Sequence, residues 1–475
     1  MLFDLEKYGK RIALISESGK RMSYLSLYKD GQMILSSIKN NEAVWTRPLV
    51  FCLCKNTIGS VVGYVALMNG GVPTLLLDAS KPYEVLKKLI DIYRPSYLWL
   101  PADKTDEYKS HGSVVCAYED YSLLATDTEV YPIHPDVLLL LTTSGSTGSP
   151  KLVKISERNL SSNAISIAEY LEIDDSERPI TSLPMHYSFG MSVLNSHLIK
   201  GATILLTEKS ILQREFWQFL EKEKATSMSG VPYTYEMLKR LRFPNMDLPW
   251  LKTLIQAGGK LSPDLVLEYV ESAHKMGRRF IVMYGQTEAS PRMSYLPFDH
   301  AKEKCSSIGI AIPGGRFALQ DVHGNPIEAS EEEGELVYEG PNVCLGYAHD
   351  MSDLAKGDEM RGVLHTGDIA KRDGDGYYYI TGRMKRFVKI WGNRCNLDSL
   401  EQMVKSITLD CACVGVDDRI TVFVIKEGLE EQIKDMLSER TGLNKRAFSV
   451  VTIENIPKNT SGKVQYQELQ KRIEI

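Results

Sequence analysis

Along residues 1 to about 380, segments with apolar residues at helical spacing alternate with short continuous apolar runs. Residues 22–38 carry apolar side chains at helical spacing, which predicts a helix. Residues 61–78 predict a helix that ends at Gly70-Gly71, followed by a buried strand. Such alternation is typical of α/β layers with largely parallel sheets. Further predicted elements are strands at residues 137–143, 202–208, 251–259 and 279–285, and a helix at residues 157–171 that Ser156 caps.

From about residue 315 the pattern changes to β-hairpins, and the stretch 372–393 predicts an antiparallel ribbon that runs into a basic turn. Two helices and three strands are then expected in a compact α+β tail. We therefore predict an α/β fold: a large N-terminal part of layered α/β subdomains with a β-rich subdomain, and a small mobile C-terminal domain. The expected divisions are residues 1–381, a hinge at 382–386, and residues 387–475.

Composition excludes several classes of protein. The chain has 475 residues, 43% hydrophobic and 25% charged, as in ordinary globular proteins. The formal net charge of −5, without long blocks of one sign, argues against bulk attraction to nucleic acid. No apolar run approaches the length of about 18 residues that a membrane span needs, and the first residues lack the apolar core of a signal peptide. We expect a cytoplasmic protein with no membrane span and no nucleic-acid partner.

The eight cysteines do not show zinc-site spacing. Cys52 and Cys54 form one C-x-C pair and Cys411 and Cys413 another, both in strand-like runs where alternate side chains share a face. We expect reduced core cysteines rather than disulfides or metal ligands.

The segment that says most about function is the Gly/Ser/Thr-rich stretch from Thr142 to Lys151, which follows a predicted buried strand. Its glycines allow close approach of the backbone to an anion, and its hydroxyls and lysine supply donors. It is not a Walker A loop, which needs the G-x-x-x-x-G-K-[ST] spacing and a following helix. On composition alone, a solvated Ser/Gly hairpin is favoured over a phosphate-binding loop.

This stretch, TTSGSTGSPK, resembles the phosphate loop of the AMP-forming adenylating superfamily, which includes acyl-CoA synthetases, nonribosomal adenylation domains and firefly luciferase. Four further segments resemble the motifs of that family in the same order, across nearly the whole chain. They are LPMHYSFG at 183–190, MYGQTEAS at 283–290, LHTGDIAKRDGDGYYYITGRMKRFVKIWGN at 364–393 and NIPKNTSGKVQYQEL at 455–469.

The resemblance implies a ligase that acts in two half-reactions. A carboxylate attacks the α-phosphate of ATP to give an acyl-adenylate and pyrophosphate, and a thiol then displaces AMP. The implied cofactors are ATP and Mg²⁺, with CoA or a phosphopantetheine carrier as acceptor. The residues that would bind the nucleotide are Thr142, Thr143, Ser144, Gly145, Ser146, Thr147, Gly148, Lys151, Gly258, Gly259, Tyr284, Gly285, Asp368 and Arg383.

Individual roles follow from the resemblance, each beside a plainer alternative. Thr287 would contact the α-phosphate, and Glu288 would hold Mg²⁺, although a glutamate at a helix start is also favoured by the helix dipole. Asp368 would accept the ribose hydroxyls, or form an Asx-turn. Lys463 would be the catalytic cation near the bridging oxygen, although its local pattern is that of a surface lysine.

The C-terminal motif also implies moving parts. Lys385 would be the hinge residue, and Gly392 would let the pantetheine arm of the thiol pass close to the backbone. The basic run around them could equally be a solvated strand face.

At the acyl site, residues 184–190 contain no acid, so a buried α-ammonium group would lack a partner. We therefore expect a non-amino-acid carboxylate. His186 would be a gate residue beside the acyl site, unless it is a core histidine. Phe189, Met191, Tyr233 and Gly258 would line a pocket for an uncharged acyl group.

Two departures from the family pattern leave alternatives open. The chain is shorter than is usual, mainly towards its N-terminus, which makes rebuilt pocket walls and small acids plausible. Residues 391–401 match only loosely, which leaves the acceptor open. The alternatives to an acyl-CoA ligase are a stand-alone ligase that loads a carrier protein on a basic patch, and a non-catalytic nucleotide-binding homologue.

Overall fold

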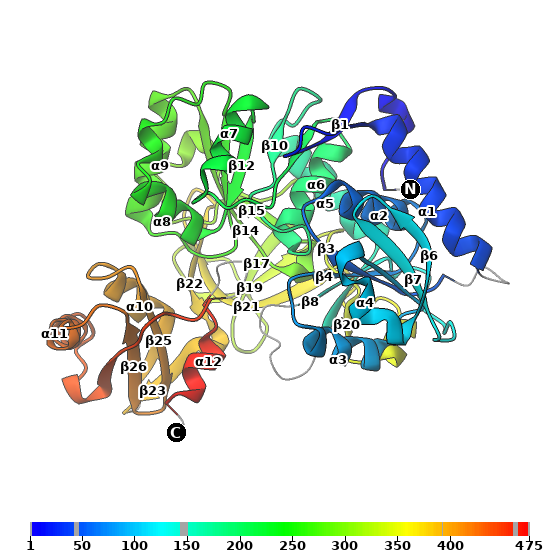
Figure 1. Ribbon diagram of the computed structural model, residues 1–475. Helices are drawn as coiled ribbons and strands as arrows, with labels where there is room; N and C mark the ends of the chain where they lie inside the picture. The colour runs from blue at the N-terminus through cyan, green and yellow to red at the C-terminus, as the bar shows by residue number, and fades with distance from the viewer. Residues whose placement is uncertain (1, 42–46, 143–150, 392, 459–463, 474–475) are drawn as a thin grey trace.

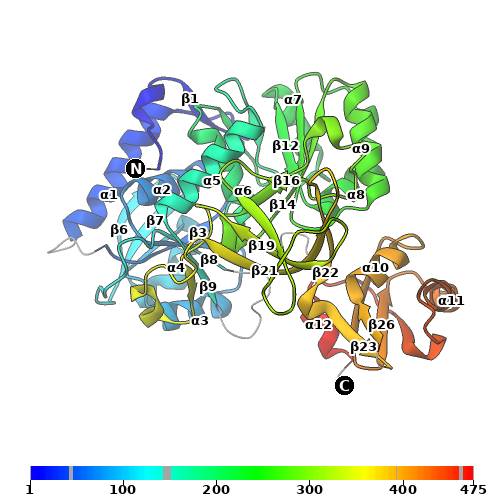
Figure 2. The same cartoon turned by 180° about the vertical axis from the view of Figure 1, so that it is seen from behind.

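Within residues 2–41, 47–142, 151–391, 393–458 and 464–473, which the computed structural model describes, three β-sheets form the larger part of the protein. Two smaller sheets form a C-terminal part that lies to one side in both views (Figures 1 and 2). The α/β class predicted from the sequence is therefore confirmed.

The first sheet has the strand order β20-β9-β8-β4-β3-β5-β7-β6, with parallel pairing among β8, β4, β3 and β5. Both of its faces are covered, so its central strands are continuous apolar runs. On β3, Cys52 and Cys54 face one core while Phe51 and Leu53 face the other, so the shared face predicted for the C-x-C pair is confirmed. The bounds are β3 Val50–Cys54, β4 Thr74–Asp78, β5 Tyr97–Pro101, β6 Gly112–Tyr118, β7 Tyr121–Thr126, β8 Leu139–Thr142, β9 Leu152–Ile155 and β20 Gly346–Ala348.

The second sheet has the order β16-β15-β14-β13-β12-β10-β11-β1-β2, parallel from β14 to β1. Its bounds are β1 Ile12–Ser16, β2 Arg21–Ser23, β10 Pro179–Ile180, β11 Ile204–Leu206, β12 Ser227–Gly230, β13 Thr253–Gln256, β14 Arg279–Gly285, β15 Arg292–Tyr295 and β16 Ile310–Ala311. The helices of this larger part are α1 Tyr24–Asn41, α2 Ile58–Asn69, α3 Tyr83–Tyr93, α4 Thr105–Tyr108, α5 Glu157–Tyr170, α6 Ser188–Leu198, α7 Arg214–Lys222, α8 Pro232–Arg240 and α9 Pro263–Lys275.

Two local predictions can be compared directly with these bounds. Helix α1 begins two residues later than expected, because the residues before it pair with β1 as strand β2. Helix α5 begins as predicted: the Ser156 hydroxyl accepts from the Asn159 amide at 3.1 Å, and the Asn159 side chain accepts from the Ser156 amide at 2.9 Å. This reciprocal capping box satisfies two amides that the helix start would leave unpaired.

The third sheet is antiparallel, with the order β18-β17-β19-β21-β22, and its last strand leads into the C-terminal part. Its bounds are β17 Arg316–Gln320, β18 Pro326–Ile327, β19 Gly334–Glu339, β21 Val363–Arg372 and β22 Tyr378–Arg383. The C-terminal part contains β23 Phe387–Ile390, β24 Asn393–Asn396, α10 Leu397–Lys405, β25 Cys411–Val416, β26 Arg419–Val424, α11 Glu430–Thr441, β27 Phe448–Thr452 and α12 Tyr466–Lys471. It has its own apolar cores, built around β25 and β26.

A buried lysine joins the first sheet to the segment after β20. Lys154 on β9 is 0% exposed, and its Nζ donates to the carbonyls of Asp353 and Lys356 at 3.2 and 3.1 Å and to Glu359 at 3.1 Å. Strand β9 follows the Gly/Ser/Thr-rich stretch in the sequence. Lys154 therefore joins this strand to the segment that follows β20.

We predict that Lys154→Met lowers the free energy of unfolding by about 2 kcal/mol, because it leaves buried carbonyls unpaired. Lys356→Met is the matched control: this lysine is exposed and pairs with Asp353, so its loss should cost under about 1 kcal/mol. Urea denaturation of both variants measures the difference. Equal losses would mean that Lys154 has no special part in holding β9.

Candidate functional site

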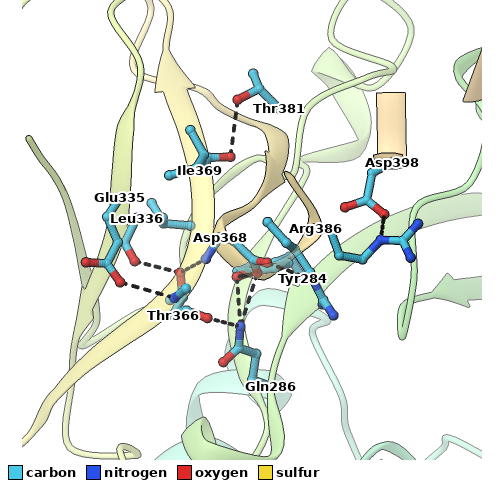
Figure 3. A network of polar contacts seen from close by, with 12 residues as sticks. Tyr284, Gln286, Glu335, Leu336, Thr366, Asp368, Ile369, Thr381, Arg386 and Asp398 are labelled. Carbon is cyan, nitrogen blue, oxygen red and sulfur yellow. Dashed lines mark hydrogen bonds and ion pairs between the residues drawn. The ribbon is translucent and has the colours of Figure 1, made fainter. Parts of the chain in front are cut away.

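A buried carboxylate lies where strand β14 of the second sheet meets the third sheet. Asp368 on β21 is 2% exposed, and each of its oxygens accepts a hydrogen bond. Oδ1 accepts from Arg383 Nε at 2.8 Å, and Oδ2 accepts from the Tyr284 hydroxyl at 2.5 Å and from Gln286 Nε2 at 3.1 Å. Figure 3 shows Tyr284 and Gln286 converging on Asp368 from the neighbouring element. The paired donors compensate a charge that burial alone would make costly.

The backbone determines this arrangement. Asp368 and Arg383 are direct cross-strand partners of the β21–β22 pair, so their side chains share a face. Burial, together with the neighbouring carboxylate, raises the pKa of Tyr284 well above its ordinary value, so its hydroxyl stays protonated and donates. Thr366 makes hydrogen bonds to two residues of this network (Figure 3). Its hydroxyl accepts from the Asp368 backbone amide at 3.1 Å, and its backbone carbonyl accepts from Gln286 Nε2 at 3.0 Å.

A second cluster joins Lys151 to Glu288 through a tyrosine. The hydroxyl of Tyr347, on β20, donates to Glu288 Oε1 at 3.1 Å, and Lys151 Nζ lies 3.1 Å from the centre of the Tyr347 ring. One carboxylate is enough to hold Mg²⁺ jointly with substrate phosphates, since Mg²⁺ keeps several waters and needs few protein ligands. The nearby lysine could bind a phosphate oxygen instead. Within the described residues, no group of three or more His, Cys, Asp or Glu could form an all-protein metal site.

Helix α6 begins within the segment 184–190 that is predicted to form the acyl site, and its first residue lies next to these clusters. The hydroxyl of Ser188, the first residue of α6, lies 3.4 Å from that of Thr287. Gly258, at the end of β13, has a φ of +85°, and a Cβ there would lie 2.7 Å from the Tyr187 hydroxyl. The positive φ favours glycine at this position, and a side chain there would also displace the Tyr187 ring.

The predicted gate residue has one charged neighbour. His186 Nε2 lies 3.9 Å from Asp78 Oδ2, beyond hydrogen-bond distance, and His186 Nδ1 has no hydrogen-bond partner among the residues that the structure describes. Burial lowers the pKa of His186, and Asp78 opposes that shift. The histidine is therefore neutral at physiological pH and can donate or accept one proton at the edge of the acyl side.

Of the four residues predicted to line the acyl pocket, Phe189, Met191 and Tyr233 lie in different surroundings in the structure. Phe189 belongs to the apolar cluster that contains Ile255 and Met283 beside the site. Met191 is 0% exposed and packs into a different core, that of α2 and β3, so it offers no surface to an acyl group. This part of the prediction is corrected: positions i and i+2 on a helix point to nearly opposite faces, so Phe189 and Met191 do not share one.

Tyr233 of α8 meets the C-terminal part of the protein. Lys458 Nζ lies 4.3 Å from the centre of its ring, and the backbones of Lys458 and Val464 form an isolated β-bridge. A second contact joins Arg240 of α8 to Asp410 at 3.2 Å. The C-terminal part therefore contacts both ends of α8.

Some predicted site residues cannot be compared with the structure. The residues that lie outside the described part of the chain are Thr143, Ser144, Gly145, Ser146, Thr147, Gly148, Gly392 and Lys463. The side chain of Lys385 is not described either. Sequence reasoning also missed contributors. Gln286, Tyr347 and Thr366 have no role in the predicted site; Gln286 and Thr366 stand inside quoted motif segments, which was the signal available.

The remaining residue that was missed is a buried arginine in the wall of the acyl side. Arg292 on β15 is 3% exposed, and its guanidinium lies 3.8 Å from the centre of the Phe189 ring. Its Nε donates to Met283 Sδ at 3.2 Å. The available signal was an arginine at the start of the short strand β15, whose sequence is RMSY.

The Asp368 cluster lies where the second and third sheets meet, and the Glu288 cluster lies near the start of helix α6. The profile of the AMP-binding enzyme family matches residues 4–348. A feruloyl-CoA synthase from Amycolatopsis sp is 30% identical over 352 residues, covering 71% of this chain and 70% of that protein. An oxalate–CoA ligase from Arabidopsis thaliana is 28% identical over 369 residues, covering 74% and 70%.

A solved o-succinylbenzoate–CoA synthetase from Bacillus subtilis, bound to its acyl-adenylate, superimposes with a TM-score of 0.82 at 22% identity, covering 98% of this chain and 97% of that one. The chain belongs to the family of AMP-binding, AMP-forming adenylating enzymes. None of the helices among the described residues has the length and apolarity to cross a membrane.

A buried histidine on α6 generates a pH prediction. Burial lowers the pKa of His197 from 6.5 to about 4, and its Nδ1 lies 2.8 Å from the Val193 carbonyl. Between pH 6.5 and about pH 4, the unfolded chain binds a proton at His197 that the folded chain does not. The free energy of unfolding should therefore fall as the pH drops, by about 3 kcal/mol at pH 4.

Urea unfolding at a series of pH values from 7 to 4 measures this slope. His197→Gln should flatten it, whereas His323→Ala, on an exposed turn, should leave it unchanged. An unchanged slope in His197→Gln would contradict the assignment.

Proposed function

We propose that the chain is an AMP-forming acid–CoA ligase that activates a carboxylic acid other than an α-amino acid. The observation that carries the proposal is the Asp368 network beside Thr287 and Glu288, in a chain whose curated relatives are acid–CoA ligases. In the first half-reaction a carboxylate oxygen bonds to the α-phosphorus of ATP, and the bond from that phosphorus to pyrophosphate breaks. In the second, a thiolate sulfur bonds to the acyl carbon and AMP leaves.

The described residues divide this task. Asp368 would accept the ribose hydroxyls, exchanging one or more of its present donors for them, and Tyr284 would present its ring to adenine. Glu288 would face the phosphates, where Mg²⁺ supplies the charge that lets a carboxylate approach them. Lys151 would leave the Tyr347 ring for a phosphate oxygen, because an ion pair is stronger than a cation–π contact at a partly exposed site.

We also propose that the chain divides at 382–386 into an N-terminal part, residues 1–381, and a mobile part, residues 387–475. Arg383 is held by Asp368, on the N-terminal side. Arg386 is held on the C-terminal side, by Asp398 at 2.6 Å and by the ring of Tyr466 at 3.7 Å. Between the two anchored arginines stand only Met384 and Lys385, so rotation about Lys385 would move one part without breaking either anchor.

CoA is favoured over a carrier protein as acceptor. A carrier would need free basic side chains, but Arg386, in the predicted basic patch, is used internally: it also lies 3.4 Å from Glu401. A ligase for a carrier protein is the second candidate, and Lys385, Lys389 and Arg394 are the residues that would serve it.

Pyrophosphate release across a panel of carboxylic acids tests the function, each acid being supplied with CoA, with a holo carrier protein, or with neither. We expect release that continues to acyl-CoA when CoA is present. Transfer to the carrier alone would favour the second candidate. Failure of every acid to release pyrophosphate would contradict the ligase assignment.

Lys463→Ala is expected to lower adenylate formation by on the order of 10²–10³, the usual loss for one donor to transition-state charge. It should spare thioester formation from pre-made acyl-adenylate, because only the first half-reaction uses that charge. Single-turnover assays of the two half-reactions measure this, with Lys471→Ala, an exposed lysine of the same part, as the control. Equal losses in both half-reactions would remove Lys463 from the catalytic role.

A further inference from the structure

A lysine of the C-terminal part contacts a tyrosine at the start of helix α8, next to which that part lies in both views (Figures 1 and 2). Lys458 Nζ lies 4.3 Å from the centre of the Tyr233 ring, and a ring face within about 6 Å attracts an ammonium group. The same Nζ lies 4.0 Å from Asp410 Oδ1, but this carboxylate also pairs with Arg240, at 3.2 Å. The cation of Lys458 is therefore held between an aromatic face and a carboxylate that has another partner.

Tyr233 belongs to the part of α8 that touches the predicted substrate side. Its ring packs against the apolar cluster beside the predicted acyl site. The two residues before it lie against the glycines predicted to line adenine and the acyl group. A Cβ on Gly258 would lie 3.1 Å from Val231 Cγ1, and one on Gly259 would lie 3.2 Å from Pro232 Cγ. A contact on the Tyr233 ring therefore reaches the substrate side through the start of α8.

Lys458 also stands at one end of the segment that contains Lys463. The backbones of Lys458 and Val464 form an isolated β-bridge. Beside this bridge, the Gln465 amide donates to the Pro457 carbonyl at 2.8 Å. These bonds tie the chain before residue 459 to the chain after residue 463. The bridge therefore couples the position of Lys458 to that of the residue next to Lys463, the cation proposed for adenylate formation.

Helix α12 fixes the second strand of this bridge to the C-terminal part. The Tyr466 hydroxyl donates to Glu401 Oε1 at 2.9 Å, and the centre of its ring lies 3.7 Å from Arg386 Cζ. Glu401 is buried and also accepts from the Cys413 amide at 3.0 Å. Tyr466 follows the bridge by two residues, so the bridge is anchored in the C-terminal part on one side and contacts Tyr233 on the other.

We propose that Lys458 is a positioning residue for the first half-reaction: its contact with the Tyr233 ring holds the bridge next to Lys463 against the substrate side. The inference rests on the proposed function and on the proposed catalytic role of Lys463. Lys458 itself would touch neither ATP nor the acid, so it would affect how often the catalytic lysine is correctly placed and not how tightly the substrates bind. Rotation about the proposed hinge would break the contact, and the second half-reaction would proceed without it.

Single-turnover assays of the two half-reactions test the inference, with whichever of acetate, succinate, benzoate and hexanoate gives the fastest pyrophosphate release. Lys458→Met removes the charge and keeps much of the side-chain length. It should lower the rate of adenylate formation at saturating ATP and acid by about 3- to 10-fold, the usual effect of one cation–π contact. The KM values should stay within about 2-fold, and thioester formation from pre-made acyl-adenylate should keep its wild-type rate.

Conservative variants separate the charge and the ring from other roles of these side chains. Lys458→Arg keeps a cation and Tyr233→Phe keeps an aromatic face, so each should retain at least about half of the wild-type rate of adenylate formation. Tyr233→Leu should reproduce the loss seen in Lys458→Met. Combining these two substitutions should add little further loss, because both remove the same contact.

Two control variants separate positioning from general attachment of the C-terminal part. Lys434→Met removes a lysine that pairs with Glu431 on the same helix, at 3.1 Å, and should change neither half-reaction. Arg240→Met removes the contact at the other end of α8, an exposed ion pair, and should slow adenylate formation less than Lys458→Met does. The thermal midpoint of Lys458→Met should stay within about 2 °C of the wild type, because this lysine is partly exposed.

Several outcomes would overturn the positioning role and leave the ligase function standing. They are an unchanged rate of adenylate formation in Lys458→Met, equal losses in both half-reactions, and an equal or larger loss in Arg240→Met. A wild-type protein that releases no pyrophosphate with any acid would overturn the ligase function and this inference together.

Discussion

A buried carboxylate with two occupied oxygens is the interaction on which the rest of this site depends. Asp368 joins β21 to β22 through Arg383 and joins the third sheet to β14 through Tyr284. Because an unpaired charge at 2% exposure would be costly, these donors and the strands that carry them must stay in register. The same carboxylate is the proposed ribose acceptor, so the interaction that aligns the sheets also prepares the nucleotide site.

The two arginines that flank the proposed hinge extend this constraint to motion. Arg383 is bound to the N-terminal part through Asp368, and Arg386 to the C-terminal part through Asp398 and Tyr466. If the chain turns at the proposed hinge, these two anchors would leave Met384 and Lys385 to absorb the rotation. A rotation between half-reactions would then leave both cores unchanged, with Lys458 and Arg240 at the contact that has to open.

Much of the fold could be predicted from the sequence because local physics determines it. The buried strands of the first two sheets are continuous apolar runs, and the Ser156 cap is a contact between near neighbours in sequence. Tyr284, Asp368 and Arg383 are in contact with one another, and their role in nucleotide binding stays a prediction. The start of α1 was placed two residues early, because the pairing of β2 with β1 replaces the helix there.

The sequence by itself determined the class of fold, the family motifs and the order of the proposed site residues, since these depend on spacing and residue type. Only the tertiary structure decided which side chains face one another. In the structure, Met191 packs into a different core and Tyr347 lies between Lys151 and Glu288. Arg292 is buried beside Phe189, and no carboxylate among the described residues pairs with it. These facts depend on contacts between residues far apart in the chain, and the chemistry of the acyl side follows from them.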